Sequence, residues 1–124
     1  MSEKEPARLT AEKKLYAMLG MAQKAGKLAS GEFSTEKAVK EGHARLVVVA
    51  GDASENTKKM FRNMCAYYQV PYCSFSDKET LGERIGKEFR ASLAIKDAGM
   101  AKTVCRYLET LKIDFEGSGG IAQE

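Results

Sequence analysis

The segment from Gly31 to Lys37 contains the residue types best suited to binding an anion. Gly31 opens a short basic stretch, and the apolar run Leu46–Ala50 follows it. A helix that starts at Gly31 presents unpaired backbone N–H groups and a partial positive charge, which can bind a phosphate or a nucleobase edge. Phe33 and Ser34 precede Lys37 by four and three residues, so helical geometry places all three on one exposed face. This arrangement favours RNA over a small metabolite, although a plain glycine turn and a surface lysine give the same pattern.

Residues suited to enzymatic catalysis are few. His43 is the only histidine and lies between a predicted helix and a predicted strand, where a surface position explains it more simply than a general base. Asp52 and Glu55 could form an acid–base pair, but helix capping explains both. Gly82–Glu88 is one residue shorter than the GxxxxGK[ST] phosphate-binding loop and ends in glutamate. We therefore predict that the protein is not an enzyme.

The cysteine content argues against a metal site and a disulfide framework. Cys65, Cys73 and Cys105 are an odd number without a CxxC pair. They fall on predicted apolar helix faces and in a strand, as small core residues do. We expect no metal and no cofactor. The cysteine usage, the lack of a signal-peptide pattern and the absence of a long apolar run indicate a cytoplasmic protein.

The composition is that of a folded globular chain. Its 124 residues are 44% hydrophobic and 30% charged, which is enough for one domain with its own core. The net charge of +3 permits an anionic partner without requiring one. The first half is rich in basic residues, among them Lys24, Lys27, Lys37, Lys40 and Arg45.

The elements that position these residues alternate between helix and strand. Short apolar runs predict strands at 27–30, 46–50, 72–75 and 91–95. Helical spacing predicts a first helix from about Thr10 to Ala25 and a second at 31–41. Three later helices are expected to start near Asp52 or Ser54, at the capping box Ser76–Glu79, and at Asp97.

Together these elements predict a three-layer α/β/α sandwich with a central four-stranded mixed sheet. We expect residues 1–9 to form a flexible lead and residues 10–115 a single domain. The glycine-rich residues 116–124 are expected to form a flexible tail.

Several short segments occur in an order typical of one protein family. They are Leu19–Lys27, Ser30–Glu32, Lys37–Val39, Leu46–Gly51, Asp52–Thr57, Val70–Tyr72 and Leu81–Lys87. On these segments, over roughly residues 10–112, the chain resembles the large-subunit ribosomal protein seven-Ae family, which binds kink-turn RNA. It is most similar to the bacterial YlxQ-like branch. The resemblance implies a small α/β/α protein that binds a sharply bent RNA duplex, with the ribosome or another protein as a further partner, and that is monomeric.

The resemblance also implies where RNA would bind. In the family, the glycine-led start of the second helix enters the RNA at tandem sheared G·A pairs. The motif is a glycine, any residue, an asparagine and a glutamate, then a lysine three residues further on. Gly31 and Lys37 match it, whereas Phe33 replaces the asparagine and Ser34 the glutamate. Phenylalanine has no hydrogen-bonding group, so each lost guanine contact is expected to cost about 1–3 kcal/mol.

The second RNA contact of the family is the loop before the last strand, here Lys87–Ala91. Phe89 could stack on an unpaired base and Arg90 could meet a phosphate; core packing and a solvated charge are the alternatives. The complete set of expected RNA-binding residues is Lys27, Gly31, Glu32, Phe33, Ser34, Lys37, Phe89, Arg90 and Ala91. The alternative function is a protein-interaction module that keeps the fold with weak kink-turn affinity and uses Phe33 as an anchor.

Overall fold

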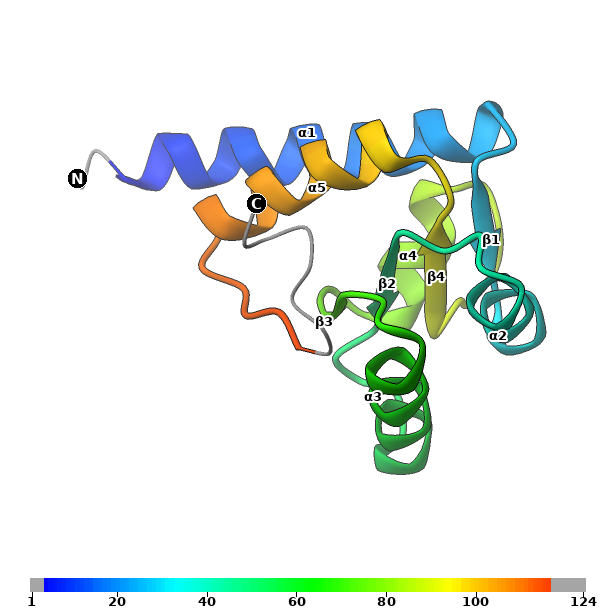
Figure 1. The fold of residues 1–124 in the computed structure, drawn as a ribbon. Helices are drawn as coiled ribbons and strands as arrows, with labels where there is room; N and C mark the ends of the chain where they lie inside the picture. The colour runs from blue at the N-terminus through cyan, green and yellow to red at the C-terminus, as the bar shows by residue number, and fades with distance from the viewer. Residues whose placement is uncertain (1–3, 117–124) are drawn as a thin grey trace.

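A mixed four-stranded sheet forms the centre of residues 4–116, the part of the chain that the computed structural model describes (Figure 1). The helices are α1 (Lys4–Lys24), α2 (Glu32–Lys40), α3 (Glu55–Tyr68), α4 (Lys78–Arg84) and α5 (Ala98–Thr110). The strands are β1 (Leu28–Ser30), β2 (Leu46–Val49), β3 (Tyr72–Ser74) and β4 (Ser92–Ile95). The strand order is β1-β4-β2-β3; β2 runs parallel to β3, and β4 is antiparallel to both β1 and β2. The predicted mixed sheet is confirmed.

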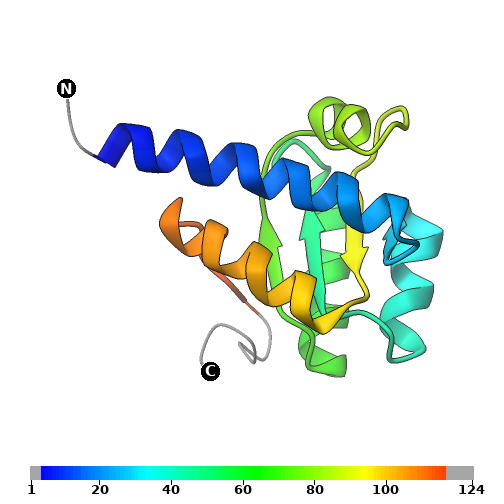
Figure 2. The same cartoon turned by 90° about the horizontal axis from the view of Figure 1, so that it is seen from above.

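Helices cover both faces of this sheet because successive side chains of a strand point to opposite sides. Leu46 and Val48 join the core cluster formed with α1, α4 and α5. Val47 and Val49 join the cluster formed with α2 and α3. Burial on both faces explains why this run lacks polar alternation. Figure 2 shows α1 and α5 side by side on one face, so the predicted α/β/α sandwich is confirmed.

The start of α3 is set by Ser54 and not by Asp52. The Ser54 Oγ accepts a hydrogen bond of 3.1 Å from the backbone N–H of Thr57. Asp52 accepts instead from the backbone N–H of Lys78, at 2.9 Å from its Oδ1. Asp52 therefore fixes the first turn of α4 to the loop after β2, which is a structural role.

The start of α4 differs by one residue from the prediction. Its N-cap is Asp77, whose Oδ1 accepts from the Thr80 N–H at 2.7 Å, so the capping box led by Ser76 is wrong. Ser76 has φ 67, and its hydroxyl lies 2.7 Å from the Tyr16 hydroxyl. The Thr80 hydrogen bonds lower the pKa of Asp77. Asp97 caps α5 as predicted.

The first helix begins earlier than its apolar spacing predicts. α1 starts at Lys4, so residues 4–9, which were expected to belong to a lead, are helical. These residues are mostly good helix formers, and Pro6 is tolerated in a first turn. Residues 6–10 are exposed, so they carry no apolar periodicity from which a helix could be predicted. Residues 1–3 lie outside the described residues.

The end of the described chain pairs with the open edge of β3. The backbone of Glu116 exchanges hydrogen bonds of 2.8 and 3.0 Å with that of Tyr72. Its Oε1 also lies 2.9 Å from the Nε of Arg62. Glu116, expected to begin the tail, is thus held against β3 and α3. The rest of that tail, residues 117–124, lies outside the described residues.

Candidate nucleic-acid interface

The turn before α2 is tied to the sheet. Gly31 has φ 92 and ψ 161, a conformation that residues with a side chain rarely adopt. Its N–H donates to the Ser92 carbonyl at 2.9 Å, and its own carbonyl accepts from the Thr35 N–H at 2.9 Å. Inside the turn, the hydroxyls of Ser92 and Thr35 form a buried hydrogen bond of 3.2 Å. The first turn of α2 therefore has a fixed position, and no side chain caps it at Gly31.

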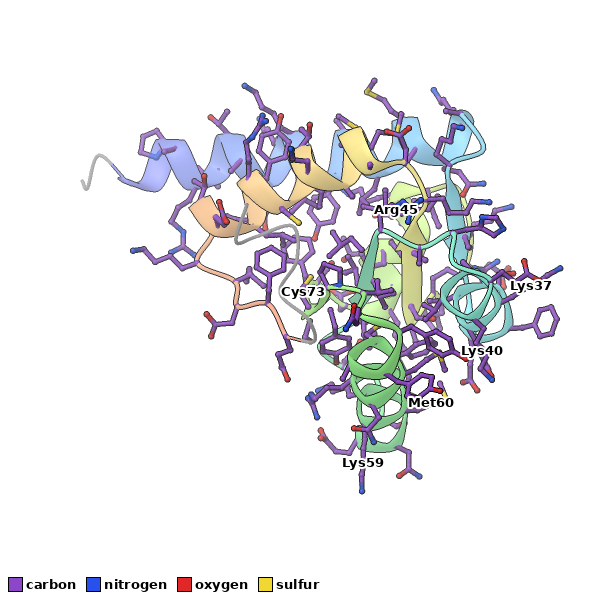
Figure 3. The ribbon with its side chains drawn as sticks, viewed as in Figure 1. Lys37, Lys40, Arg45, Lys59, Met60 and Cys73 are labelled. Atoms are coloured by element: carbon purple, nitrogen blue, oxygen red, sulfur yellow. The ribbon has the colours of Figure 1, made fainter. Side chains whose placement is uncertain are left out.

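Three predicted residues occupy the exposed side of α2. The structure places Phe33, Ser34 and Lys37 there, as their spacing predicts. Phe33 is 78% exposed, which is unusual for a large apolar ring. Figure 3 shows Lys37 directed away from the sheet. This side of the helix therefore offers an apolar ring, a hydroxyl and a cation to a ligand.

The loop between α4 and β4 folds back onto α4. The Lys87 N–H donates to the Gly82 carbonyl at 2.8 Å, and the Arg90 N–H donates to the Lys78 carbonyl at 3.1 Å. Gly82 is buried, and a Cβ there would overlap the carbonyl group of Glu88. The close approach of the loop thus requires glycine at position 82.

The Arg90 side chain joins this loop to the turn before α2. Its Nε donates to the Ser30 Oγ at 3.1 Å, and its Nη1 donates to the Phe89 carbonyl at 2.9 Å. Arg90 is half-buried, so it is a positioned group and not a freely solvated charge. A guanidinium has five N–H donors, and those left over can bind a phosphate.

Phe89 and Ala91 flank Arg90 in the sequence. Phe89 is 66% exposed, so core packing does not explain it. It faces a hollow of about 430 Å³ whose other lining residues are Glu79, Glu83, Lys87 and Glu88. Ala91 is half-buried and packs against the core cluster of α2 and α3.

A groove of about 540 Å³ brings the two predicted segments together. It lies beside β1 and α2 and is lined by four cations, Lys37, Lys87, Arg90 and Lys96. Within residues 4–116, none of these four has a carboxylate oxygen within 4.0 Å. The carboxylate that lines the groove, Glu41, has its Oε1 3.8 Å from the His43 Nε2. The surplus of positive charge favours an anionic ligand.

The other predicted residues lie at the margin of the groove or outside it. Glu32 is exposed in the first turn of α2. Lys27 is exposed at the opposite end of β1, and its side chain is not among the residues that line the groove. The structure therefore brings Phe33, Ser34, Lys37 and Arg90 together but does not add Lys27 to them.

Sequence reasoning missed Lys96 and His43 as parts of this groove. Lys96 follows β4 directly, and its N–H donates to the Lys27 carbonyl at 2.8 Å. It reaches the groove because β4 pairs with β1 in antiparallel register. Recognising it required the strand order, which no local motif carries. The sequence suggests His43 only as a surface residue or a catalytic base, although it lies close to the end of α2.

The three thiols are core residues, as predicted. Cys65, Cys73 and Cys105 are buried, and burial raises the pKa of Cys65 to about 12 and that of Cys105 to about 11. Burial also raises the pKa of Cys73. Thiols in this state do not act as nucleophiles at neutral pH. Over residues 4–116, no group of three or more metal-binding side chains is close enough to hold an ion. In the same range, no helix has the length and apolar composition needed to cross a bilayer.

Known proteins resemble this chain over most of its length. The model of the ribosomal protein L7Ae/L30e/S12e/Gadd45 family matches residues 13–105. The RNA-binding protein YlxQ of Bacillus subtilis (strain 168) is 38% identical over 94 residues, which are 76% of this chain and 94% of that protein. The RNA-binding protein YlxQ of Enterococcus faecium is 38% identical over 96 residues, which are 77% of this chain and 92% of that protein.

Solved structures show the same fold. A protein with unknown function from Bacillus halodurans C superimposes with a TM-score of 0.74 at 34% identity, covering 77% of this chain and 97% of that one. The 15.5kD RNA binding protein of Giardia lamblia superimposes with a TM-score of 0.68, covering 83% of this chain and 88% of that one. Its identity of 19% makes it a likeness of fold alone.

Proposed function

Because the chain belongs to the ribosomal protein L7Ae/L30e/S12e/Gadd45 family, in its YlxQ-like branch, we propose that it is a non-enzymatic RNA-binding protein. The two YlxQ relatives carry the name RNA-binding protein and align with about three quarters of the chain. Their names agree with the prediction that the chain is not an enzyme. We further propose that the RNA is structured and kink-turn-like, and that the protein acts in the cytoplasm in association with the ribosome.

The strongest structural support is the hydrogen bond of 3.1 Å from Arg90 to Ser30. It links the two segments that the family resemblance assigns to RNA, the α2 start and the loop before β4. On this linked surface, Lys37, Lys87 and Arg90 have no carboxylate partner within residues 4–116. Cations held by a rigid scaffold bind phosphates at fixed spacing, and so recognise RNA by shape.

Phe33 changes how such a surface would read RNA. An asparagine at this position would hydrogen-bond to a guanine edge, whereas an exposed phenylalanine ring would stabilise the complex by stacking on an unpaired base. Stacking of this kind contributes about 1–3 kcal/mol per base and depends little on which base is present. We therefore propose that the protein recognises the bend and its unpaired bases more than the sheared G·A pairs.

A titration by fluorescence anisotropy tests the proposal. The RNAs are a kink-turn duplex and an unbent duplex of the same length, and the variant is Lys37→Ala. Lys102→Ala, an exposed lysine on α5 at the other face of the sheet, serves as the control. We expect sub-micromolar binding with a preference for the bent RNA, weakened by Lys37→Ala and unchanged by Lys102→Ala. Equal, weak binding of both duplexes would favour the interaction module, with Phe33 as the anchor for a protein.

A further inference from the structure

β1 is an edge strand, and its outer side has no neighbouring strand within residues 4–116. Two residues flank it and bond toward β4. The Lys27 carbonyl accepts from the Lys96 N–H at 2.8 Å, and the Gly31 N–H donates to the Ser92 carbonyl at 2.9 Å. Alternate residues of an antiparallel ladder bond to the partner, so the N–H and C=O groups of Leu28 and Ser30 point to the open side. In the described part of the chain, neither residue has a main-chain partner. β1 therefore leaves the main-chain donors and acceptors of Leu28 and Ser30 available to a ligand at its edge.

The groove of about 540 Å³ follows this open side of β1. Phe33 and Arg90 lie at the end of the groove near Ser30, and Lys96 and His43 lie at the end where β1 begins. A strand rises about 3.3 Å per residue, so the three residues of β1 separate these ends by about 10 Å. The groove thus has cations at both ends, an apolar ring at one of them and polar main chain between them.

We propose that this groove binds two or three unpaired nucleotides of the RNA, continuing from the structured region held at the α2 start. The inference rests on the proposed function and extends its site to Lys96. A path of about 10 Å is short, so it accommodates two or three nucleotides of an unpaired strand and not a longer segment. Arg90 and Lys96 bind phosphates at the two ends, and the Phe33 ring stacks on a base.

The open side of β1 favours unpaired nucleotides over a duplex as the ligand. Bases in a duplex have their Watson–Crick edges occupied, whereas unpaired bases can bond to the main chain of Leu28 and Ser30. An extended peptide could also pair with this edge, but the four cations in the groove favour a polyanion. The exposed ring of Phe33, at 78%, favours a ligand with flat aromatic faces.

The test compares a blunt kink-turn duplex with the same duplex carrying three unpaired nucleotides at its 5′ or its 3′ end. We expect one of the two extensions to tighten binding by about tenfold, which corresponds to one well-stacked base and one phosphate contact. Lys96→Ala is expected to remove most of this gain, so that this variant binds the extended and the blunt duplex with affinities that differ by less than about twofold. Lys102→Ala is the matched control and should keep the whole gain.

Crosslinking supplies a second readout that does not depend on affinity. A 4-thiouridine in the favoured extension should crosslink to peptides that contain Leu28–Phe33 or His43. If the blunt duplex binds but neither extension adds affinity, the groove assignment is overturned and the proposed function stands. Crosslinks confined to α3 or α5, or a gain that survives Lys96→Ala, would overturn it as well. If no RNA binds at all, both the groove assignment and the proposed function are wrong.

Discussion

Replacing Gly82 by alanine tests whether the loop before β4 owes its position to its close approach to α4. An ideal Cβ at Gly82 would stand 1.7 Å from the carbonyl oxygen of Glu88 and 3.2 Å from the Phe89 nitrogen. Real Cβ atoms essentially never come within 3.0 Å of such atoms. The loop would therefore have to move away from α4 by more than about 1 Å.

Two effects of opposite sign determine the stability of this variant. Overpacking a close contact costs about 1–3 kcal/mol. Replacing glycine by alanine within a helix stabilises the folded state by up to about 1 kcal/mol. We expect a net loss of about 1–2 kcal/mol in the free energy of unfolding, which lowers Tm by roughly 3–8 °C. Because the displaced loop carries Phe89 and Arg90, the Arg90–Ser30 hydrogen bond should weaken and RNA affinity should fall by about tenfold.

Gly20→Ala is the matched control. Gly20 also lies inside a helix and faces a backbone carbonyl, but its Cβ would stand 3.4 Å from the Arg84 oxygen, an ordinary contact. This variant should be as stable as the parent, or more stable by up to about 1 kcal/mol. Urea unfolding and the anisotropy titration measure both quantities. A Gly82→Ala protein with unchanged stability and unshifted amide resonances of Phe89 and Arg90 would show that the loop does not pack on α4 as described.

Three other changes have expected outcomes. Phe33→Asn together with Ser34→Glu restores hydrogen-bonding groups at the α2 start and should raise kink-turn affinity by at least about tenfold; a folded variant with unchanged affinity would refute the assignment of this helix to the RNA site. Lys37→Ala should reduce the slope of log affinity against log salt by about one unit, and salt-independent binding by the parent would contradict an RNA ligand. The buried thiols have raised pKa values, so they ionise more readily in the unfolded chain. The free energy of unfolding should therefore fall as pH rises above about 9, by up to about 1.4 kcal/mol per pH unit for each thiol. Alanine at positions 65, 73 and 105 should flatten this decline, as measured by urea unfolding at several pH values.

Local patterns were enough to predict most of the fold. The apolar run at Leu46–Ala50 predicted a strand covered on both faces, and β2 is buried throughout. Asp97 was recognised as a cap because a carboxylate directly before an apolar helix face is a strong local signal. These features depend on neighbours in the sequence, which is why they could be predicted without tertiary information.

What could not be predicted depends on contacts between distant segments. Ser76 has the residue type of a capping box, but its hydroxyl bonds to Tyr16, and Asp77 caps the helix instead. Lys96 reaches the groove only because β4 pairs with β1. Lys27, basic and near the motif in sequence, lies exposed at the far end of the same strand. Proximity along the chain was a poor guide wherever the strand order decided which residues meet.

The way the site is held in place supports its use as a binding surface, even though Phe33 and Ser34 replace the polar residues of the family. Thr35 and Ser92 are both fully buried, and their hydroxyls bond to each other at 3.2 Å. An apolar pair of similar size would avoid the cost of desolvating two hydroxyls. Together with the bond from Arg90 to Ser30, this contact fixes the α2 start against β4 and the loop before it.

Such positioning matters more for shape recognition than for a general hydrophobic contact. A stacking ring and a phosphate-binding cation contribute to affinity together only if their separation matches the RNA, because ordering either group on binding costs free energy. Phe33, Lys37 and Arg90 stand on segments that are joined before any ligand arrives. Removing the Arg90–Ser30 hydrogen bond should therefore reduce the affinity for the bent RNA more than that for an unbent duplex. An unbent duplex contacts the cations one at a time and does not depend on their spacing.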